Sequence, residues 1–240
     1  MTWSILARDA DGRFGAAIAS PFFAVGAHCL HARRGVGIVA TQALMNPLYG
    51  PAALMLLAQG HAAASVVAAL TAADAGRDQR QLHLLGVDGA AAAHTGSACI
   101  ECCAHVAGAH YSVAGNMLAG PEVTAATADA FERSAGRPLA ERLLAALAAG
   151  EAAGGDKRGK QSAALVIQGD EDRLELDLRV DDHVEPVREL ERLHAVSLER
   201  FQPFVRCLPG RRDPVGELDR SRIEAAIERF GAARAPGSRG

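Results

Sequence analysis

The chain opens with short apolar segments that are separated by turn residues. Residues 4–7 and 14–19 are apolar at nearly every position, and residues 9–12 (Asp-Ala-Asp-Gly) supply a turn between them. A segment that is apolar throughout, without polar alternation, is typical of a strand that is covered on both faces. We therefore expect these two segments to form a buried β-hairpin.

The same patterns continue along the chain. Asp88-Gly89 is a clear hairpin signal, and apolar residues recur at helical spacing in several longer stretches. The further strands that we expect are 25–32, 36–41, 81–87, 90–95, 106–113, 162–168 and 174–180, and the expected helices are 52–59, 62–73, 122–134, 138–149, 186–206 and 216–230. Blocks of antiparallel strands with inserted helix pairs favour an α+β fold of two helix-covered sheets over a parallel βαβ fold.

The length allows one large domain or two small ones, and we expect one large domain. We place it at residues 1–206, followed at 207–240 by a polar extension with a peripheral helix and a disordered tail. The formal net charge of -3 argues against a general nucleic-acid binder, and no apolar run is long enough to span a membrane. No signal-peptide pattern opens the sequence, and five cysteines, an odd number, favour reduced thiols, so we expect a cytoplasmic protein.

One cysteine cluster has the spacing of metal ligands. Cys99, Cys102 and Cys103 lie near His105 and His110, and a structural zinc site needs four ligands in a tetrahedral arrangement. There is no second Cys-x-x-Cys pair, so free thiols are favoured over a metal site. The glycine-flanked loop at 154–159 lacks the Walker spacing and precedes a strand, which argues against a phosphate loop.

Thr2 is the first candidate for chemistry. Threonine is small enough for the initiator Met1 to be removed, which would leave a hydroxyl and a free α-amine on one residue. An α-amine with a pKa near 8 is a usable base at neutral pH, and such an amine is a known activator of a threonine nucleophile. The alternative is that Thr2 merely begins a strand.

Several polar residues stand where apolar strands end. Gln42, Asn46 and Asn116 could meet a developing oxyanion, or each could cap a loop. Arg158 could pair with Asp156 in a turn, or it could offer its forked donors to a substrate carbonyl or carboxylate.

Four stretches together carry a resemblance to a known family. Residues 2–9, 35–43, 115–118 and 154–165 resemble an uncharacterised bacterial family, a domain of unknown function, that is placed by similarity in the Ntn-hydrolase (N-terminal nucleophile) superfamily. The resemblance covers about residues 1–193. It implies a four-layer αββα sandwich, in which two antiparallel sheets pack face to face with helices outside.

The resemblance also implies roles for individual residues. Thr2 would be both nucleophile and base, and Asn116 and Arg158 would be catalytic with it. The resemblance implies that Thr41, Gln42 and Ala43 supply oxyanion donors and that Asp156, Arg158 and Gln161 line or brace the pocket. Asn46 is a further candidate for substrate binding. Such a mechanism needs no metal and no organic cofactor.

The sequence departs from proteasome-like members of the superfamily at two places. These members place a lysine on the third strand, where residues 25–32 contain none, and an aspartate after the second strand, where this chain has Ser20. We interpret Arg158 as the cation that replaces the lysine.

Two functions from different classes follow. The first is hydrolysis of a small linear amide by Thr2, with a homo-oligomer as a plausible assembly. The alternative is a non-catalytic protein that binds a small ligand or a partner through the same fold. Relatives with an added peptidoglycan-binding segment suggest cell-wall amides, but the tail after residue 187 is too short and too charged to argue for them.

Overall fold

The computed structural model describes residues 2–234, which form two antiparallel sheets. In the described residues, the six-stranded sheet has the order β10-β9-β2-β1-β8-β7 and the four-stranded sheet the order β3-β4-β5-β6. The strands are β1 (Thr2–Arg8), β2 (Phe14–Ser20), β3 (Leu30–Arg33), β4 (Gly37–Ala43), β5 (Arg80–Gly86), β6 (Ala91–Thr95), β7 (Ala104–Gly108), β8 (Tyr111–Asn116), β9 (Ser162–Gln168) and β10 (Leu176–Val180).

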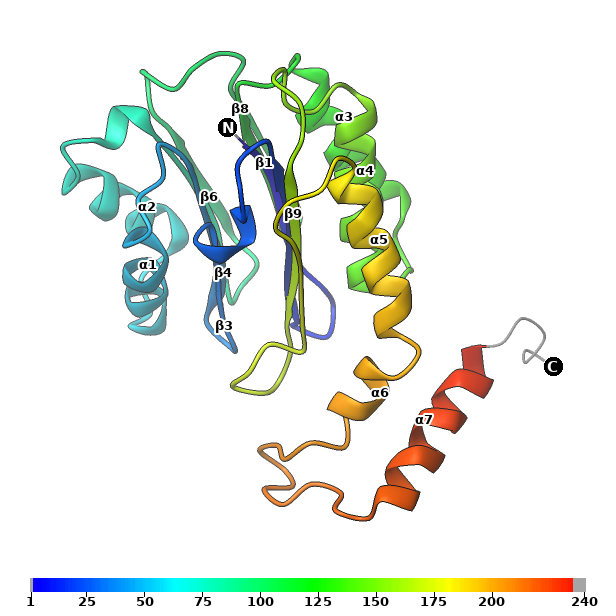
Figure 1. Cartoon of the computed structure of the whole chain (residues 1–240). Helices are drawn as coiled ribbons and strands as arrows, with labels where there is room; N and C mark the ends of the chain where they lie inside the picture. Colours follow the sequence, from blue (N-terminus) through cyan, green and yellow to red (C-terminus); the bar gives the residue numbers. More distant parts are fainter. Residues whose placement is uncertain (1, 235–240) are drawn as a thin grey trace. The chain divides into compact units, whose positions relative to one another are not determined.

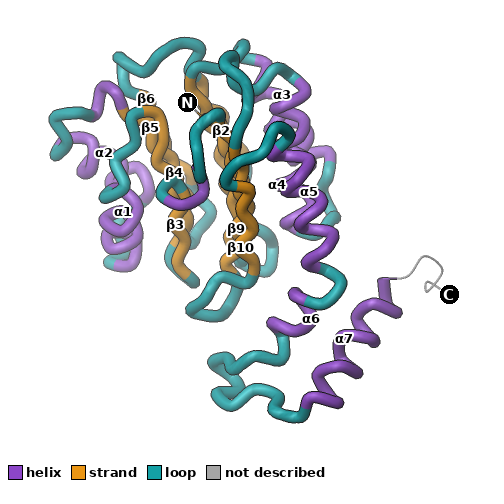
Figure 2. Tube along the Cα trace, viewed as in Figure 1, coloured by secondary structure: helices purple, strands orange, loops and turns teal. Residues whose placement is uncertain are grey.

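The two sheets pack face to face and helices cover their outer faces (Figures 1 and 2). Helices α1 and α2 pack on the four-stranded sheet, and α3 and α4 pack on the six-stranded sheet. The expected α+β fold, a four-layer αββα sandwich, is therefore confirmed. The helices are α1 (Tyr49–Ala58), α2 (Ala63–Ala72), α3 (Glu122–Arg133), α4 (Leu139–Ala152), α5 (Pro186–Ser197), α6 (Phe201–Val205) and α7 (Arg220–Arg234).

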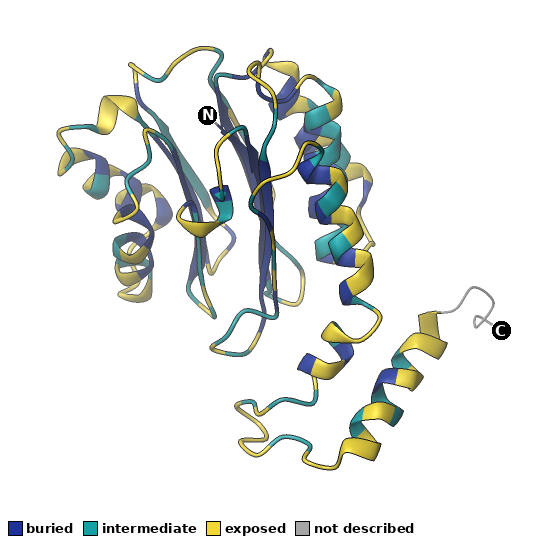
Figure 3. Ribbon diagram, viewed as in Figure 1, coloured by how far each residue is buried: buried dark blue, intermediate teal, exposed yellow. Residues whose placement is uncertain are grey.

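Strand β1 lies inside its sheet and is covered on both faces, as its apolar pattern predicts. Alternate residues of a strand point to opposite faces. Leu6 packs with Ile38 and Leu85 of the other sheet, whereas Trp3 lies against α4. Thr2 shares the face of Leu6, so its side chain points between the sheets. Figure 3 shows β1 and its neighbours as the most continuously buried part of the fold.

The predicted strand 25–32 is wrong in its first half. Residues Val25–Ala27 form a short 3₁₀ helix, and Ala24 before it has a φ of 52°. The Ser162 hydroxyl accepts a hydrogen bond from the Val25 N–H at 3.1 Å, and the Ala24 N–H donates to the carbonyl of Asp181 at 3.0 Å. These partners satisfy backbone groups that would otherwise pair with a neighbouring strand. The apolar residues of this segment therefore pack against the core from a turn and not from a strand.

Two other predicted elements are each divided in two. Residues 106–113 belong to a hairpin, β7 and β8, because the chain turns between Gly108 and Tyr111, where the non-glycine residue His110 has a φ of 64°. The predicted helix 186–206 ends at Ser197, whose hydroxyl donates to the carbonyl of His194 at 2.7 Å, and α6 follows as a separate helix. A side chain that binds its own helix's backbone in this way competes with continuation of the helix.

The chain divides into two compact units, Met1–Leu190 and Glu191–Gly240, and α5 crosses the division. Within the second unit α6 packs on α7, and Arg200 is paired with Glu224 at 2.6 Å. The domain boundary at residue 206 stays a prediction. The expected disordered tail lies in part outside the described residues, and so does Met1. No helix in residues 2–234 has the length and apolar character that crossing a bilayer requires.

The close approach of α4 to β1 generates a stability prediction. A Cβ added at Gly150 would lie 2.6 Å from Nε1 of Trp3 and 2.4 Å from Oγ1 of Thr127. We expect Gly150→Ala to lower the free energy of unfolding by about 1–3 kcal/mol through overpacking, despite alanine's better helix propensity. Urea denaturation followed by circular dichroism measures this.

The matched control is Gly231→Ala in α7, where no atom lies within 4 Å of the added Cβ. That substitution should be neutral or stabilising, because only helix propensity changes. Equal effects of the two substitutions would contradict the packing at Gly150.

Candidate functional site

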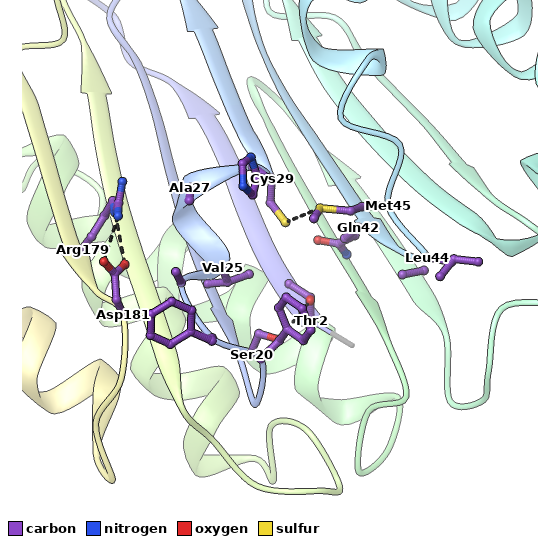
Figure 4. Close-up of a pocket in the computed structure, with 15 residues that line it drawn as sticks. Thr2, Ser20, Val25, Ala27, Cys29, Gln42, Leu44, Met45, Arg179 and Asp181 are labelled. Carbon is purple, nitrogen blue, oxygen red and sulfur yellow. Dashed lines mark hydrogen bonds and ion pairs between the residues drawn. The ribbon is translucent and has the colours of Figure 1, made fainter.

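A pocket of about 680 Å³ lies at the start of β1, and residues of both sheets line it (Figure 4). Thr2 and Ser20 come from the six-stranded sheet, and Gln42 and Ala43 come from the four-stranded sheet. The remaining lining residues belong to the turn after β2, the turn after β4 and the end of β10: Phe22, Phe23, Ala24, Val25, Ala27, His28, Cys29, Leu44, Met45, Arg179 and Asp181.

Thr2 is held at the pocket wall by its neighbours on both sides. Its residue is 4% exposed, and its hydroxyl donates to Oγ of Ser20 at 3.3 Å. The register of β1 and β8 sets Thr2 opposite Asn116, whose Nδ2 donates to the Thr2 carbonyl at 3.4 Å. Two of the three predicted catalytic residues, Thr2 and Asn116, are thus brought together.

Gln81, which the sequence did not single out, joins the two sheets beside Thr2. Its Oε1 accepts one hydrogen bond from Nε2 of Gln42 at 2.7 Å and another from Nδ2 of Asn116 at 3.0 Å. Its Nε2 donates to the carbonyl of Gly115 at 2.9 Å, and Ser4 donates to Oε1 of Gln42 at 2.8 Å. Both hydrogens of the Asn116 amide are used, whereas one hydrogen of the Gln42 amide has no partner in the described residues.

His83 extends this network deeper between the sheets. Its Nε2 lies 2.8 Å from Oγ of Ser4 and its Nδ1 lies 3.0 Å from Oγ of Ser112. Full burial lowers the pKa of His83 to about 3, so the imidazole is neutral and has one N–H. Because the Ser4 hydrogen goes to Gln42, the heavy-atom pattern assigns the proton to Nε2 of His83, and Ser112 donates to Nδ1.

Asp156 and Arg158 lie on a loop that packs beside the end of β8. Asp156 is bridged to Leu118, two residues beyond Asn116. One oxygen of the Asp156 carboxyl accepts from the Arg158 N–H at 2.9 Å and lies 3.5 Å from Nε of the Arg158 guanidinium. The other oxygen is buried with no hydrogen-bond partner in the described residues, and burial raises the pKa of Asp156. Neither residue lines the pocket.

Three other predicted site residues brace loops around the pocket without lining it. The Thr41 hydroxyl donates to the carbonyl of Asn46 at 3.1 Å, and Nδ2 of Asn46 donates to Asp74 at 3.2 Å. Gln161 donates through Nε2 to Asp182 at 3.0 Å. Their roles in substrate binding stay predictions.

The turn after β4 shows why sequence reasoning missed much of the pocket. Ala43 adopts a φ of 66°, in the left-handed region that favours glycine, and the chain then turns so that Leu44 and Met45 line the pocket. No glycine marks this turn. Cys29 was also missed, and burial raises the pKa of its thiol to about 11.

The cysteine cluster contains free thiols. The thiol of Cys99 donates to the carbonyl of Arg80 at 3.3 Å, and that of Cys103 donates to the carbonyl of Ile100 at 2.9 Å. Within residues 2–234, no three His, Cys, Asp or Glu side chains are arranged to hold a metal ion.

The model of the family of unknown function DUF1028 matches residues 2–190. The chain belongs to this family. A crystal structure of a DUF1028 protein from Silicibacter pomeroyi is 33% identical to it, with a TM-score of 0.84, and the match covers 91% of this chain and 96% of that one. A search of curated proteins found no match.

Two more distant structures were also found. Anbu (ancestral beta-subunit) from Yersinia bercovieri is 14% identical with a TM-score of 0.41, and the match covers 82% of this chain and 94% of that one. An Anbu Gly-1 mutant from Hyphomicrobium sp. strain MC1 is 14% identical with a TM-score of 0.43, covering 82% and 95%. At these scores the likeness carries no argument about this DUF1028 chain.

The buried His83 predicts a pH-dependent stability. Its pKa is about 3 in the folded protein and near 6.5 in the unfolded chain, so the unfolded state binds more protons between these values. The contribution of His83 is fully present above pH 6.5 and is lost as the pH falls toward 3. We therefore expect His83→Gln to be less stable than the wild type at pH 7.5, and the difference to shrink by several-fold at pH 5.

Urea denaturation at both pH values measures the two free energies of unfolding. The control is His61→Gln, at an exposed histidine. The difference in free energy of unfolding between the wild type and this variant should be the same at both pH values. A constant gap between wild type and His83→Gln would show that His83 does not titrate in this range.

Proposed function

We propose that the protein is an amide-bond hydrolase whose nucleophile is Thr2, after removal of Met1. The observation that supports this most strongly is the position of the Thr2 hydroxyl. It lies at the wall of a sizeable pocket, on the first strand, with its backbone fixed by Asn116. A hydroxyl at the start of a chain carries its own base, the α-amine, which no interior residue has.

The two other nucleophilic side chains that line the pocket are less suitable. The pKa of Cys29 is raised to about 11, so its thiol stays protonated at neutral pH, and the thiolate is the reactive form. Ser20 lies inside the sheet, opposite Ser162, and accepts the hydrogen bond of Thr2. It has no α-amine of its own, so Thr2 is the better candidate.

The reaction that follows from this arrangement has two stages. Oγ of Thr2 attacks the amide carbon and its proton passes to the α-amine. The C–N bond then breaks and the leaving nitrogen takes that proton, which leaves an ester between Thr2 and the acyl group. Water, deprotonated by the same amine, attacks the ester, and the acyl group departs as a carboxylic acid while Thr2 regains its proton.

Gln42 is the side chain best placed to stabilise the oxyanion. It lines the pocket with Thr2, and one of its amide hydrogens has no partner in the described part of the chain. Ser4 binds the oxygen of the Gln42 amide and Gln81 binds its nitrogen, so the orientation of the amide is fixed before a substrate binds. A donor preorganised in this way stabilises a tetrahedral intermediate. Asn116, whose hydrogens are both used, is a positioning residue in this scheme.

A cation near the α-amine would lower its pKa and keep it a free base at neutral pH. The lining residues include no lysine, and the guanidinium of Arg179 is paired with Asp181 at 2.8 Å. We assign this role to Arg158, which lies on the loop between α4 and β9 and pairs with Asp156 at a longer distance, 3.5 Å.

The second candidate is a non-catalytic protein that binds a small ligand in the same pocket. It is favoured by the partner of the Thr2 hydroxyl, which is the neutral Ser20 where proteasome-like relatives have an aspartate. In that case substitution of Thr2 would leave ligand binding intact.

The nucleophile is tested by comparing Thr2 variants on a panel of acyl p-nitroanilides that runs from acetyl to hexanoyl. Intact mass should first show that Met1 is absent. Thr2→Ala should then reduce kcat at least about 1,000-fold, whereas Thr2→Ser, which keeps the hydroxyl and the amine, should retain measurable turnover. Retention of Met1, or equal rates for wild type and Thr2→Ala, would refute this mechanism.

The role of Arg158 is tested by the pH dependence of kcat/KM. If Arg158 is the cation that acts on the α-amine, Arg158→Ala removes that positive charge, so the pKa of the amine should rise and the acid limb should move to higher pH by about 0.5–1 unit. Arg158→Lys should largely restore the limb, and Arg133→Ala, at an exposed site on α3, is the control. Unchanged turnover and pH profile in Arg158→Ala would remove Arg158 from the mechanism.

A further inference from the structure

We propose that the pocket takes an uncharged, apolar acyl group, so that the substrates are amides of medium-chain or aryl acids. This inference rests on the proposed function for the position of the carbonyl carbon. It goes beyond that function by naming the half of the substrate that the pocket recognises.

The lining of the pocket is predominantly apolar. Carbon and sulfur side chains supply most of it, and those that lie beyond Thr2 are Phe22, Phe23, Ala24, Val25, Ala27, Cys29, Ala43, Leu44 and Met45. The sulfur atoms of Cys29 and Met45 are in contact at 3.5 Å, so this part of the wall is closed and weakly polar. Binding of an apolar group to such a surface is favourable because it removes apolar area from water, whereas binding of a charged group brings no such stabilisation.

The charges in the lining cancel each other. Among the lining residues, Arg179 carries a guanidinium and Asp181 a carboxylate. The two form a two-point pair, with Nε to Oδ1 at 3.2 Å and Nη2 to Oδ2 at 2.8 Å. Figure 4 shows this pair on one side of the pocket and Gln42 and Met45 on the other. A charged acyl group would lose hydration here without gaining an unpaired countercharge.

The uncharged polar groups that bind a carbonyl gather at one end. Thr2 and Ser20 lie next to each other, and Gln42 lies across from them (Figure 4). Val25 and Ala27 lie further along the same pocket. A scissile carbonyl at Thr2 therefore directs one half of the substrate along the apolar wall.

The half that enters is the acyl half. After the C–N bond breaks, the amine leaves, but the acyl group stays bonded to Thr2 until water arrives. The pocket that Thr2 lines must hold that group through the second stage. A volume of about 680 Å³ is within the usual range for a small-molecule site and is far larger than an acetyl group needs.

The inference is tested by binding to the Thr2→Ala variant, which separates recognition from turnover. Calorimetric titration compares propanamide, hexanamide and succinamate, which has a carboxylate at the far end. Each buried methylene should tighten binding about fourfold, so hexanamide should bind on the order of 60-fold more tightly than propanamide, and succinamate should bind most weakly.

A second variant shows that the effect belongs to this pocket. Ala27 is exposed in the pocket lining, so Ala27→Phe should fill the space without burying new surface in the core. In Ala27→Phe, hexanamide should no longer bind more tightly than propanamide. The control, Ala64→Phe, places the same ring on an exposed position of α2 and should change nothing.

The two proposals fail in different ways. Succinamate binding as tightly as hexanamide, or no dependence on chain length, overturns the apolar-acyl assignment whatever the turnover results are. Thr2-dependent hydrolysis that is fastest for acetyl or succinyl anilides overturns it too, while leaving the nucleophile in place. Chain-length-dependent binding that Ala27→Phe removes, with no hydrolysis of any anilide, supports the pocket assignment and rejects the hydrolase.

Discussion

The carbonyl oxygen of one buried amide, Gln81, joins the two sheets at the end where the pocket lies. It accepts one hydrogen bond from Gln42 of the four-stranded sheet and one from Asn116 of the six-stranded sheet. A buried amide without hydrogen-bond partners costs roughly 1–3 kcal/mol, so the arrangement in which Gln81 keeps both hydrogen bonds is strongly favoured. Deeper between the sheets, hydrogen bonds that involve Ser4, His83 and Ser112 add further directional links. Apolar contacts hold the rest of the interface but set no fixed register between the layers. The acceptor shared at Gln81 helps to fix that register beside Thr2.

The position of Thr2 then depends on two kinds of constraint on one strand. On its outer face β1 carries Trp3, which packs closely against Gly150 of α4. On its inner face Thr2 and Ser4 enter the polar network, and Leu6 enters the apolar core. Alternation along a single strand therefore anchors the same segment to a helix layer and to the opposite sheet. Thr2, at the end of that strand, therefore has little freedom to move away from the pocket.

Much of the fold could be predicted from the sequence because its signals are local. Apolar runs identified β1, β2 and β9, and helical spacing identified α3 and α4. The errors fall where backbone geometry depends on distant partners. Ala24, Ala43 and His110 adopt positive φ although none of them is glycine, so the sequence did not mark these positions as turns. The resemblance to a known family indicated Thr2, Gln42 and Asn116. It did not indicate the apolar residues of the pocket, because the turns that carry them have no local signal in the sequence.

The direction of the hydrogen bonds through His83 has a consequence for chemistry at the pocket. With the proton on Nε2, Ser4 is free to donate to Oε1 of Gln42. The other tautomer would claim the Ser4 hydrogen and leave that oxygen without its donor, and the amide could then rotate and present oxygen in place of N–H to a substrate carbonyl. In the mechanism that we propose, the tautomer of His83 thus decides whether Gln42 presents N–H or oxygen to a substrate, although His83 does not itself line the pocket.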